Sequence, residues 1–264
     1  MIGSANQKVR RKPPAEVTVS DIAQAMALPT ERVWALSADS RVLFHARERR
    51  FVRGKMRDID PPTSAGRAIL RRLHRFLAWQ FPPHCLVHGG AIGRSCFSSA
   101  RVHRRKHAKQ LIVQVDVFNC YPSISTAAVD AALLRRGFSA DTASILSGLL
   151  TVSGCVAQGS PVSCDALNLY TRTYDDITIS CTSEHEAAAA TAFVSEELAR
   201  AQLEVNRRKA HRRGVQRGSQ PRASPPTVHG LIVSRGRGVA IAHQQSSKAL
   251  SLASAYSRGC RVVS

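Results

Sequence analysis

Two adjacent aspartates, Asp175 and Asp176, lie in a stretch rich in β-forming residues, YTRTYDDITIS. Neighbouring carboxylates repel each other, so a strand that holds both is costly unless a cation lies between them. We predict two strands of a hairpin with this acidic pair at its tip, beside a metal ion. The alternative for such a pair is an ordinary Asp-rich β-turn.

A third carboxylate, Asp116, lies in a second predicted strand, LIVQVDVF, whose residues point alternately to opposite faces. Burying Asp116 there is costly without a partner. On neighbouring strands the three carboxylates would form a hard-oxygen site suited to Mg²⁺, and two such ions can hold the attacking and leaving oxygens of phosphoryl transfer. The residues therefore predict a two-magnesium site for nucleotide addition.

The charge of the chain indicates a polyanionic partner. Lys and Arg number 38 against 18 Asp and Glu among 264 residues, which gives a formal net charge of +20. Such an excess is typical of proteins that bind nucleic acid, although a generally basic surface also improves solubility. The positive charge is concentrated in segments 10–12, 47–57, 71–75, 101–109 and 207–222.

Cysteine usage and hydropathy indicate the compartment. The 7 cysteines include no C-x-x-C pair, which favours a reduced, cytoplasmic protein without structural zinc. No apolar run approaches the roughly 20 residues of a membrane span, and the amino terminus lacks the apolar core of a secretion signal. We expect a cytoplasmic protein with no membrane partner.

Helix-start signals and turn signals alternate along the chain. Gly54 marks the turn of a predicted hairpin over 45–60, whose Arg53, Lys55 and Arg57 are candidate contacts for a triphosphate. A second hairpin is predicted around a turn at 235–238. Helices are predicted to start at Ser20, Thr30, Ser64, Ser125, Ser139, Ser160 and Ser183. This order favours the α+β class, an antiparallel sheet with helices on one face.

Four segments in this order, VDVFNCYPSIS, QGSPVS, RTYDDITIS and LEVNRRK, resemble the catalytic motifs of bacterial reverse transcriptases. The resemblance implies that Asp116, Asp175 and Asp176 bind the two Mg²⁺ ions. It also implies that Tyr121, Gln158 and Lys209 lie at the nucleotide, together with Arg53 and Arg57 of the basic hairpin. Tyr121 is either a core aromatic residue or a steric gate that excludes the 2′-hydroxyl of ribonucleotides.

Two further segments resemble motifs of retron reverse transcriptases. SSARVH is similar to N-A-x-x-H, with Ser99 in place of Asn and with Ala100 and His103 matching. VHG is similar to the V-T-G of the region that recognises the cognate RNA, and it comprises Val228, His229 and Gly230. The resemblance implies that both segments bind RNA. The two histidines could equally have structural roles.

The resemblance implies a right-hand polymerase with fingers and palm and a truncated or vestigial thumb. The expected domains are a basic arm with helices at 1–44, fingers at 45–109, palm at 110–243 and a thumb remnant or tail at 244–264. Its expected partners are an RNA template, a DNA or RNA primer, dNTPs, a cognate structured noncoding RNA and an effector protein in antiviral defence.

The sequence departs from the family beside the paired acids, where Thr173 and Tyr174 replace an aromatic and a small residue. This bulk near the predicted metals leaves a second class of function open, an RNA-binding protein that kept the fold and has little or no polymerase activity. A nucleotidyltransferase that extends ends without copying a template is a third.

Overall fold

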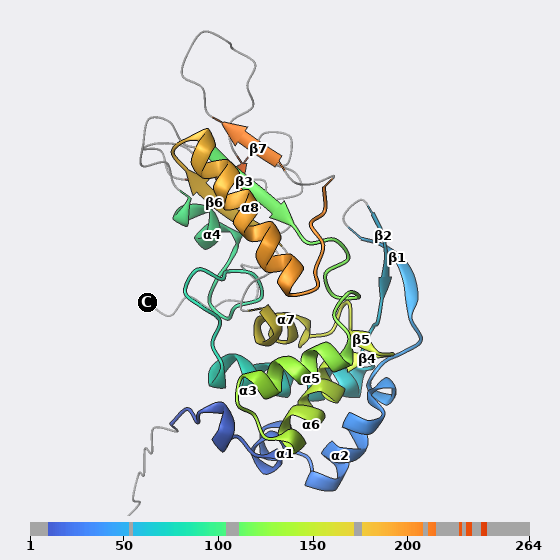
Figure 1. The fold of residues 1–264 in the computed structure, drawn as a ribbon. Coiled ribbons are helices and arrows are strands. Elements are labelled where there is room, and N and C mark those ends of the chain that lie inside the picture. The colour runs from blue at the N-terminus through green and yellow to red at the C-terminus, as the bar shows by residue number, and fades with distance from the viewer. Residues whose placement is uncertain are drawn as a thin grey trace, which may run out of the picture. The chain divides into compact units, whose positions relative to one another are not determined.

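A computed structural model describes residues 10–52, 55–103, 111–171 and 176–207, and the backbone of strands at 211–214, 227–228, 231–233 and 239–241. Side chains are described in the first four ranges, except those of residues 55 and 176. Figure 1 shows α-helices together with short antiparallel sheets, which confirms the predicted α+β class. No helix among the described residues is both long and apolar enough to cross a lipid bilayer.

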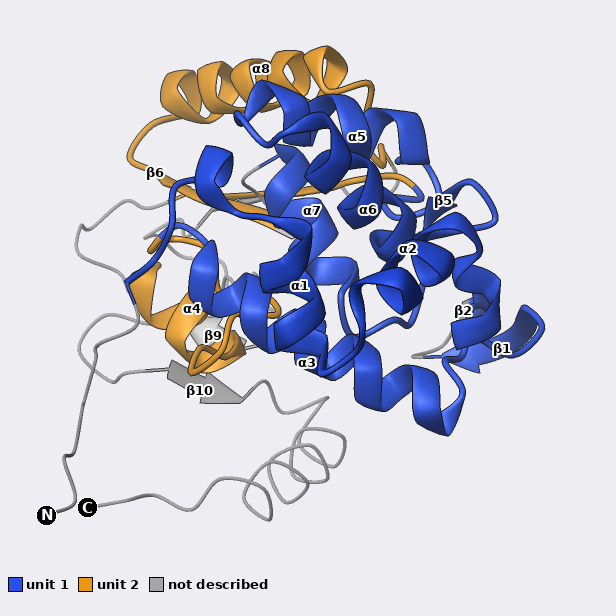
Figure 2. Cartoon of the chain, turned by 90° about the horizontal axis from the view of Figure 1, so that it is seen from below, with its two compact units in different colours: residues 1–84, 119–174 blue, residues 85–118, 175–264 orange. Residues whose placement is uncertain are grey.

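The chain forms two units that alternate along the sequence (Figure 2). Unit 1 comprises residues 1–84 and 119–174, and unit 2 comprises residues 85–118 and 175–264. These bounds differ from the predicted division at residues 44, 109 and 243. The assignment of segments to fingers, palm and thumb stays a prediction.

Unit 1 is mainly helical, with two short hairpins. Its hairpins pair β1 (Glu48–Val52) with β2 (Lys55–Ile59), and β4 (Thr151–Val152) with β5 (Cys155–Val156). The first of these confirms the hairpin predicted around Gly54. Its helices are η1 (Pro14–Glu16), α1 (Val19–Met26), α2 (Thr30–Ala38), η2 (Ser40–Leu43), α3 (Ser64–Gln80), α5 (Thr126–Arg135), α6 (Ala140–Leu150) and α7 (Ser163–Thr171).

The core of unit 1 lies between α1, α2, α3 and α6. Each helix contributes large apolar side chains that are at most 2% exposed, and each of these adds about 1.5–3 kcal/mol through its burial. Helix α6 is buried on several faces, so it shows no narrow apolar stripe. The buried residues include Ile22, Met26, Val33, Leu36, Leu70, Leu73, Leu77, Ile145, Leu146 and Leu149.

Helix caps explain where the helices of unit 1 begin. The predictions of Ser125 and Ser139 as caps are confirmed, since each hydroxyl accepts a backbone N–H of the first turn. The prediction of Ser20 is wrong, because Thr18 caps α1. Its hydroxyl accepts from the Asp21 amide at 3.2 Å, and the Asp21 carboxylate accepts from the Thr18 amide at 2.8 Å. Helix α3 begins at Ser64 as predicted, and Thr63 caps it.

The segment before the paired aspartates differs from the prediction. Helix α7 begins at Ser163 rather than at Ser160, and it runs to Thr171, where the first strand of the acidic hairpin was predicted. Ala166, Leu167 and Leu169 are buried in α7, which stabilises the helix over the β-forming residues that follow. Residues 170 and 171, at the start of the predicted first strand, are therefore helical, and the rest of that strand and the tip of the hairpin lie outside the described residues. The strand that begins at Asp176 pairs with β3.

Within the described part of unit 2, the strands form two antiparallel three-stranded sheets. In the first, β3 (Leu111–Asp116) lies between β6 (Asp176–Cys181) and β7 (His211–Gly214). In the second, β9 (Leu231–Val233) lies between β8 (Thr227–Val228) and β10 (Val239–Ile241), which confirms the hairpin predicted around 235–238. The helices are α4 (Cys96–Val102) and α8 (Glu184–Arg200).

Helix α8 packs against β3 and β6. Ser183 caps it as predicted, and Ala187, Val194 and Leu198 bury the apolar stripe that the sequence shows. Consecutive residues of β3, Ile112 and Val113, are both 2% exposed, so the central strand is covered on both faces. This explains why β3 carries apolar side chains at nearly every position.

One close approach in unit 1 gives a test of the packing. A Cβ atom added to Gly148 of α6 would lie 2.2 Å from the Ser37 carbonyl oxygen at the end of α2. We expect Gly148→Ala to lower the free energy of unfolding by about 1–3 kcal/mol, although alanine stabilises an unobstructed helix by about 1 kcal/mol. Urea denaturation measures the change. Ser144→Ala, at an exposed position of α6, is the control, and a Gly148→Ala protein as stable as the control would contradict the packing.

Candidate functional site

Asp116 and Asp176 meet at one end of the sheet in unit 2. Asp116 is the last residue of β3, Asp176 is the first residue of β6, and the antiparallel register makes them partners. Directly opposed Cα atoms in such a pair are about 4.5–5.5 Å apart. Residues that are 60 positions apart in sequence are thus neighbours, as a shared metal site requires. Asp175 and the side chain of Asp176 lie outside the described residues, so their metal role stays a prediction.

The Asp116 carboxylate is held by a residue that the sequence analysis did not select. Asp116 is 8% exposed, and its Oδ2 atom accepts a hydrogen bond from Asn206 Nδ2 at 2.8 Å. The backbone N–H of Asn206 also donates to the backbone carbonyl of Asp116 at 2.8 Å. A buried carboxylate needs such donors. Asn206 belongs to LEVNRRK, and the asparagine of that motif was the signal that could have identified it.

The segment before Asn206 extends this contact along the chain. Val205 forms a bridge with Val117, and the Phe118 amide donates to the Glu204 carbonyl at 2.7 Å. Residues 204–206 therefore run beside the end of β3 and fix the side chain of Asn206 against Asp116. Lys209, predicted at the triphosphate in the same motif, lies outside the described residues.

In unit 1, two of the predicted nucleotide-binding residues are in contact. The Gln158 side-chain oxygen accepts from the Arg57 guanidinium at 3.2 Å, and its nitrogen donates to the Asp58 carbonyl at 2.9 Å, in the amide orientation that satisfies both atoms. The Gln158–Gly159 turn therefore rests on strand β2. Gly159 has φ +104°, and a Cβ atom there would lie 2.9 Å from Ile59 Cγ2, so both the turn and the close approach favour glycine. Arg53 lies outside the described residues.

Asp60 ties this turn to the hairpin. It is 4% exposed, and its carboxylate accepts from Arg47 Nε at 2.7 Å, Arg47 Nη2 at 3.2 Å and the Gln158 amide at 3.1 Å. The Asp60 amide donates in return to the Gln158 carbonyl at 2.8 Å. The hydrogen bond to Asp60 raises the pKa of Arg47 above its ordinary value, so the guanidinium stays charged. These bonds fix the position of Gln158 relative to Arg57.

Helix α7, which follows the turn, is anchored to α3. His74 Nδ1 lies 2.7 Å from Asp165 Oδ2, and Asp165 is 8% exposed. The hydrogen bond to Asp165 raises the pKa of His74, while burial raises the pKa of Asp165. On the same helix Cys164 Sγ lies 3.6 Å from the hydroxyl of half-buried Tyr121, so Tyr121 packs against the helix that follows Gln158.

The two predicted RNA-binding segments belong to elements that pack together in unit 2. Ser99 and Ala100 are buried in α4, and His103 ends that helix with its Nδ1 atom 2.9 Å from Ser180 Oγ of β6. Helix α4 packs against β8, β9 and β10, and Val228 is the last residue of β8. His229 and Gly230 lie outside the described residues. Burial gives Ser99 and Ala100 a packing role, whereas half-buried His103 is the more accessible of the three.

The predicted metal ligands are only partly within the described side chains. No three His, Cys, Asp or Glu side chains among them gather around one point. Two of the three predicted ligands, Asp175 and Asp176, have side chains outside that set. Asp116 is the predicted ligand whose surroundings are described, and a buried carboxylate at a strand end fits the oxygen chemistry that Mg²⁺ requires.

The Asp60 contacts generate a prediction about the turn. Asp60→Asn replaces the charged acceptor of Arg47 and the Gln158 amide, so we expect the free energy of unfolding to fall by about 1–3 kcal/mol and the Gln158 amide to exchange faster with D₂O. Asp58→Asn is the matched control, because that carboxylate is 66% exposed and 4.0 Å from Arg49; it should change stability by less than about 0.5 kcal/mol. Equal effects of the two substitutions would contradict the role of Asp60.

Comparison with known proteins supports the resemblance seen in the motifs. The chain is similar to the retron Mx65 reverse transcriptase of Myxococcus xanthus, with 27% identity over 239 aligned positions that cover 73% of this chain and 54% of that protein. The chain thus spans about half the length of the curated relative that it matches. No family model matches the sequence. The chain is thus similar to a retron reverse transcriptase, the family that its motifs resemble.

Proposed function

We propose that this chain is an RNA-directed DNA polymerase of retron type, which copies a cognate structured noncoding RNA into DNA. The observation that carries the proposal is the register of Asp116 with Asp176, together with the hydrogen bond from Asn206 to Asp116. Motifs far apart in sequence meet at that strand end. The sheet β6-β3-β7 is then the palm and the β1–β2 hairpin belongs to the fingers.

Asp116, Asp175 and Asp176 would hold two Mg²⁺ ions. When bound, such ions lower the pKa of the attacking hydroxyl and neutralise the triphosphate and the departing pyrophosphate. The fold of the chain would place the carboxylate ligands around these ions. Asn206 fixes the rotamer of the Asp116 carboxylate, so that one of its oxygens is turned to a defined side.

The residues of unit 1 would bind the incoming nucleotide. Arg57 carries the positive charge that a triphosphate requires, and Gln158 holds its guanidinium. Tyr121 packs on α7 and would exclude a 2′-hydroxyl from the sugar position. Lys209 and Arg53 are proposed as further triphosphate contacts.

The net charge of +20 supports an RNA template and a primer as the macromolecular partners. His103 and the segment 228–230 would contribute to recognition of the cognate RNA, since α4 packs on the strands that carry this segment. A role in antiviral defence with an effector protein belongs to the same proposal.

A second candidate function is an RNA-binding protein of the same fold with little or no synthesis. The observation that favours it is the sequence Thr173-Tyr174 directly before the paired aspartates, where the family has an aromatic and a small residue. Bulk at this position can displace metal ligands. Such a protein would bind RNA tightly and extend no primer.

Primer extension on an RNA template, with dNTPs and Mg²⁺, tests the proposal. We expect Asp116→Asn to lower the rate of nucleotide addition by about a thousandfold, because a neutral amide stabilises the metal-bound transition state by several kcal/mol less. RNA affinity should remain within about twofold. Asp141→Asn, which removes an exposed carboxylate from the first turn of α6, should leave the rate unchanged.

Three outcomes of this experiment are informative. Template-dependent extension that is lost in Asp116→Asn supports the polymerase. Tight RNA binding by a wild-type protein that extends no primer supports the second candidate. Extension that ignores the template sequence would indicate a nontemplated nucleotidyltransferase and would overturn the proposal.

Discrimination between ribonucleotides and deoxyribonucleotides tests Tyr121. We expect Tyr121→Val to increase the incorporation of ribonucleotides relative to dNTPs by about tenfold or more, because a smaller side chain leaves room for the 2′-hydroxyl. Phe118→Val is the control, since Phe118 is an aromatic residue of the same segment that is 47% exposed. Unchanged discrimination in Tyr121→Val would make Tyr121 a core residue without a gating role.

A further inference from the structure

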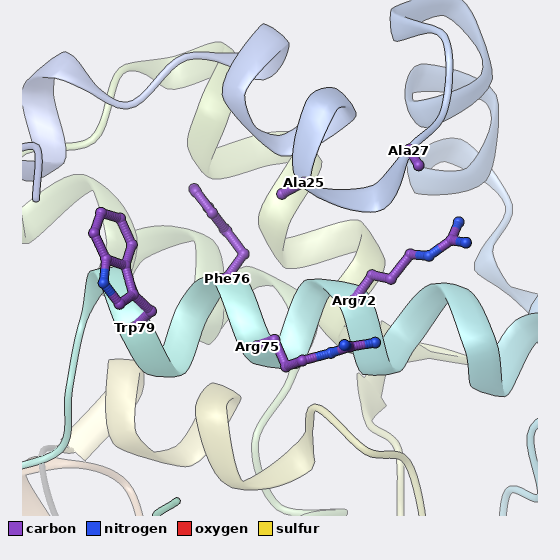
Figure 3. Close-up of a pocket in the computed structure, with 6 residues that line it drawn as sticks. All are labelled: Ala25, Ala27, Arg72, Arg75, Phe76 and Trp79. Carbon is purple, nitrogen blue, oxygen red and sulfur yellow. The ribbon is translucent and has the colours of Figure 1, made fainter. Parts of the chain in front are cut away.

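A groove in unit 1 is lined by residues that take no part in the sites described above. It lies between α1 and α3, has a volume of about 450 Å³, and is lined by Ala25, Ala27, Arg72, Arg75, Phe76 and Trp79. Figure 3 shows Phe76 extending from α3 toward the segment that carries Ala25 and Ala27, with Trp79 one turn further along. The groove combines aromatic and cationic side chains.

The groove has a high positive charge, and hydrogen bonds to nearby backbone carbonyls hold its arginine side chains in place. Helix α3 contains no Asp or Glu, and its Arg67, Arg71, Arg72 and Arg75 are all exposed. Arg72 Nη1 donates to the Met26 carbonyl at 3.1 Å, and Arg75 Nε donates to the Arg71 carbonyl at 3.4 Å. Backbone carbonyls hold guanidinium groups without cancelling their charge. The groove therefore presents cations whose positions are already restricted, which suits an anionic ligand.

The aromatic side of the groove selects among anionic ligands. Trp79 is 38% exposed although it is a large aromatic residue, and Phe76 is half-buried. On α3 these rings follow Arg72 and Arg75 at a spacing of four residues, which places rings and cations on adjoining turns of one helix face. Rings stack on nucleic-acid bases and arginines bind phosphates. An acidic protein segment would use the cations and would gain little from the rings.

We propose that the groove between α1 and α3 binds a single-stranded segment of RNA. Phosphates contact Arg72 and Arg75, and bases stack on Phe76 and Trp79. Single-stranded RNA fits better than duplex RNA, because the base faces of a duplex are already stacked on one another. This site extends the proposed function without depending on it, since RNA can bind here in a protein that lacks polymerase activity.

Intrinsic fluorescence provides a direct reporter of the groove. The chain has 2 tryptophans, so Trp34→Phe leaves Trp79 as the only tryptophan, which is excited selectively over the 4 tyrosines. We expect single-stranded oligouridine, added without Mg²⁺ or dNTPs, to quench Trp79 in a saturable manner. Duplex RNA of the same length should quench it far less. Binding of the single strand without any change in Trp79 emission would overturn the proposal.

Paired substitutions then separate the groove from general electrostatic attraction. Arg72→Gln with Arg75→Gln should weaken binding of oligouridine about tenfold or more and reduce the dependence of log K on log salt by about 1.4, the value for two phosphates on a single strand. Trp79→Ala should weaken binding by at least about fivefold with an unchanged salt dependence, as loss of stacking predicts. Circular dichroism establishes that each variant is folded, and Arg75→Gln alone keeps the Arg72 contact to Met26.

Arg32→Gln with Arg135→Gln is the matched control, since it removes the same charge from exposed positions on α2 and α5. It should change affinity less than twofold. Equal losses in the groove variant and the control would overturn the proposal. Unchanged RNA affinity together with weakened binding of a polyglutamate peptide would make the groove a protein-docking surface and would overturn it as well. Primer extension by the wild-type protein is measured in a separate assay. Failure of the polymerase proposal can therefore be distinguished from failure of the RNA-binding groove.

Discussion

Burying a carboxylate at the end of a central strand costs free energy unless hydrogen-bond donors accompany it. In the sheet of unit 2, the segment beside Asp116 supplies such donors. Asn206 supplies donors from both its side chain and its backbone to Asp116. On the other side of β3, β6 begins opposite the same residue. Polar groups of Asp116 and Asn206, from two segments far apart in sequence, therefore meet at one strand end, while the four residues of β3 other than Gln114 and Asp116 are apolar. This pairing of a buried carboxylate with dedicated donors is what marks the strand end as a candidate site.

Unit 1 applies the same principle to a loop. If only its own backbone held the Gln158 turn, the turn could adopt several conformations. Asp60 makes it part of the β1–β2 hairpin through hydrogen bonds to both the turn and Arg47. The α7 helix behind the turn is anchored in turn by His74 and Asp165. Recognition groups that are supported from two sides keep a defined geometry before a ligand arrives.

The sequence was most informative where one local interaction determines the structure. The Gly54 hairpin, the caps at Ser125, Ser139 and Ser183, and the β-pairing around 235–238 depend on short-range chemistry, and all were predicted. The start of α1 was displaced because Thr18 offers better capping geometry than Ser20. Residues 170 and 171 were predicted in a strand and are helical, because buried apolar residues extend α7, an effect of tertiary packing that β-propensity does not include.

Prediction of the site residues likewise succeeded where a motif was enough and failed where contacts between distant segments decide. Motif order correctly implied that Asp116 and Asp176 are neighbours, since the register pairs them. It did not identify Asn206 or Asp60, whose importance depends on which buried group they contact. Such partners become visible only when segments distant in sequence are placed together, as with Gln158 and the hairpin that ends at Asp60.

The alternation of the two units along the sequence has a consequence for biosynthesis. Strand β3 leaves the ribosome before α5, α6 and α7 of unit 1, and its partners β6 and β7 follow only after them. Until then β3 has no neighbour on either edge, and a long apolar strand in that state favours aggregation. Neither unit can be produced as one uninterrupted fragment, and a rare-codon pause soon after residue 118 would prolong the vulnerable interval.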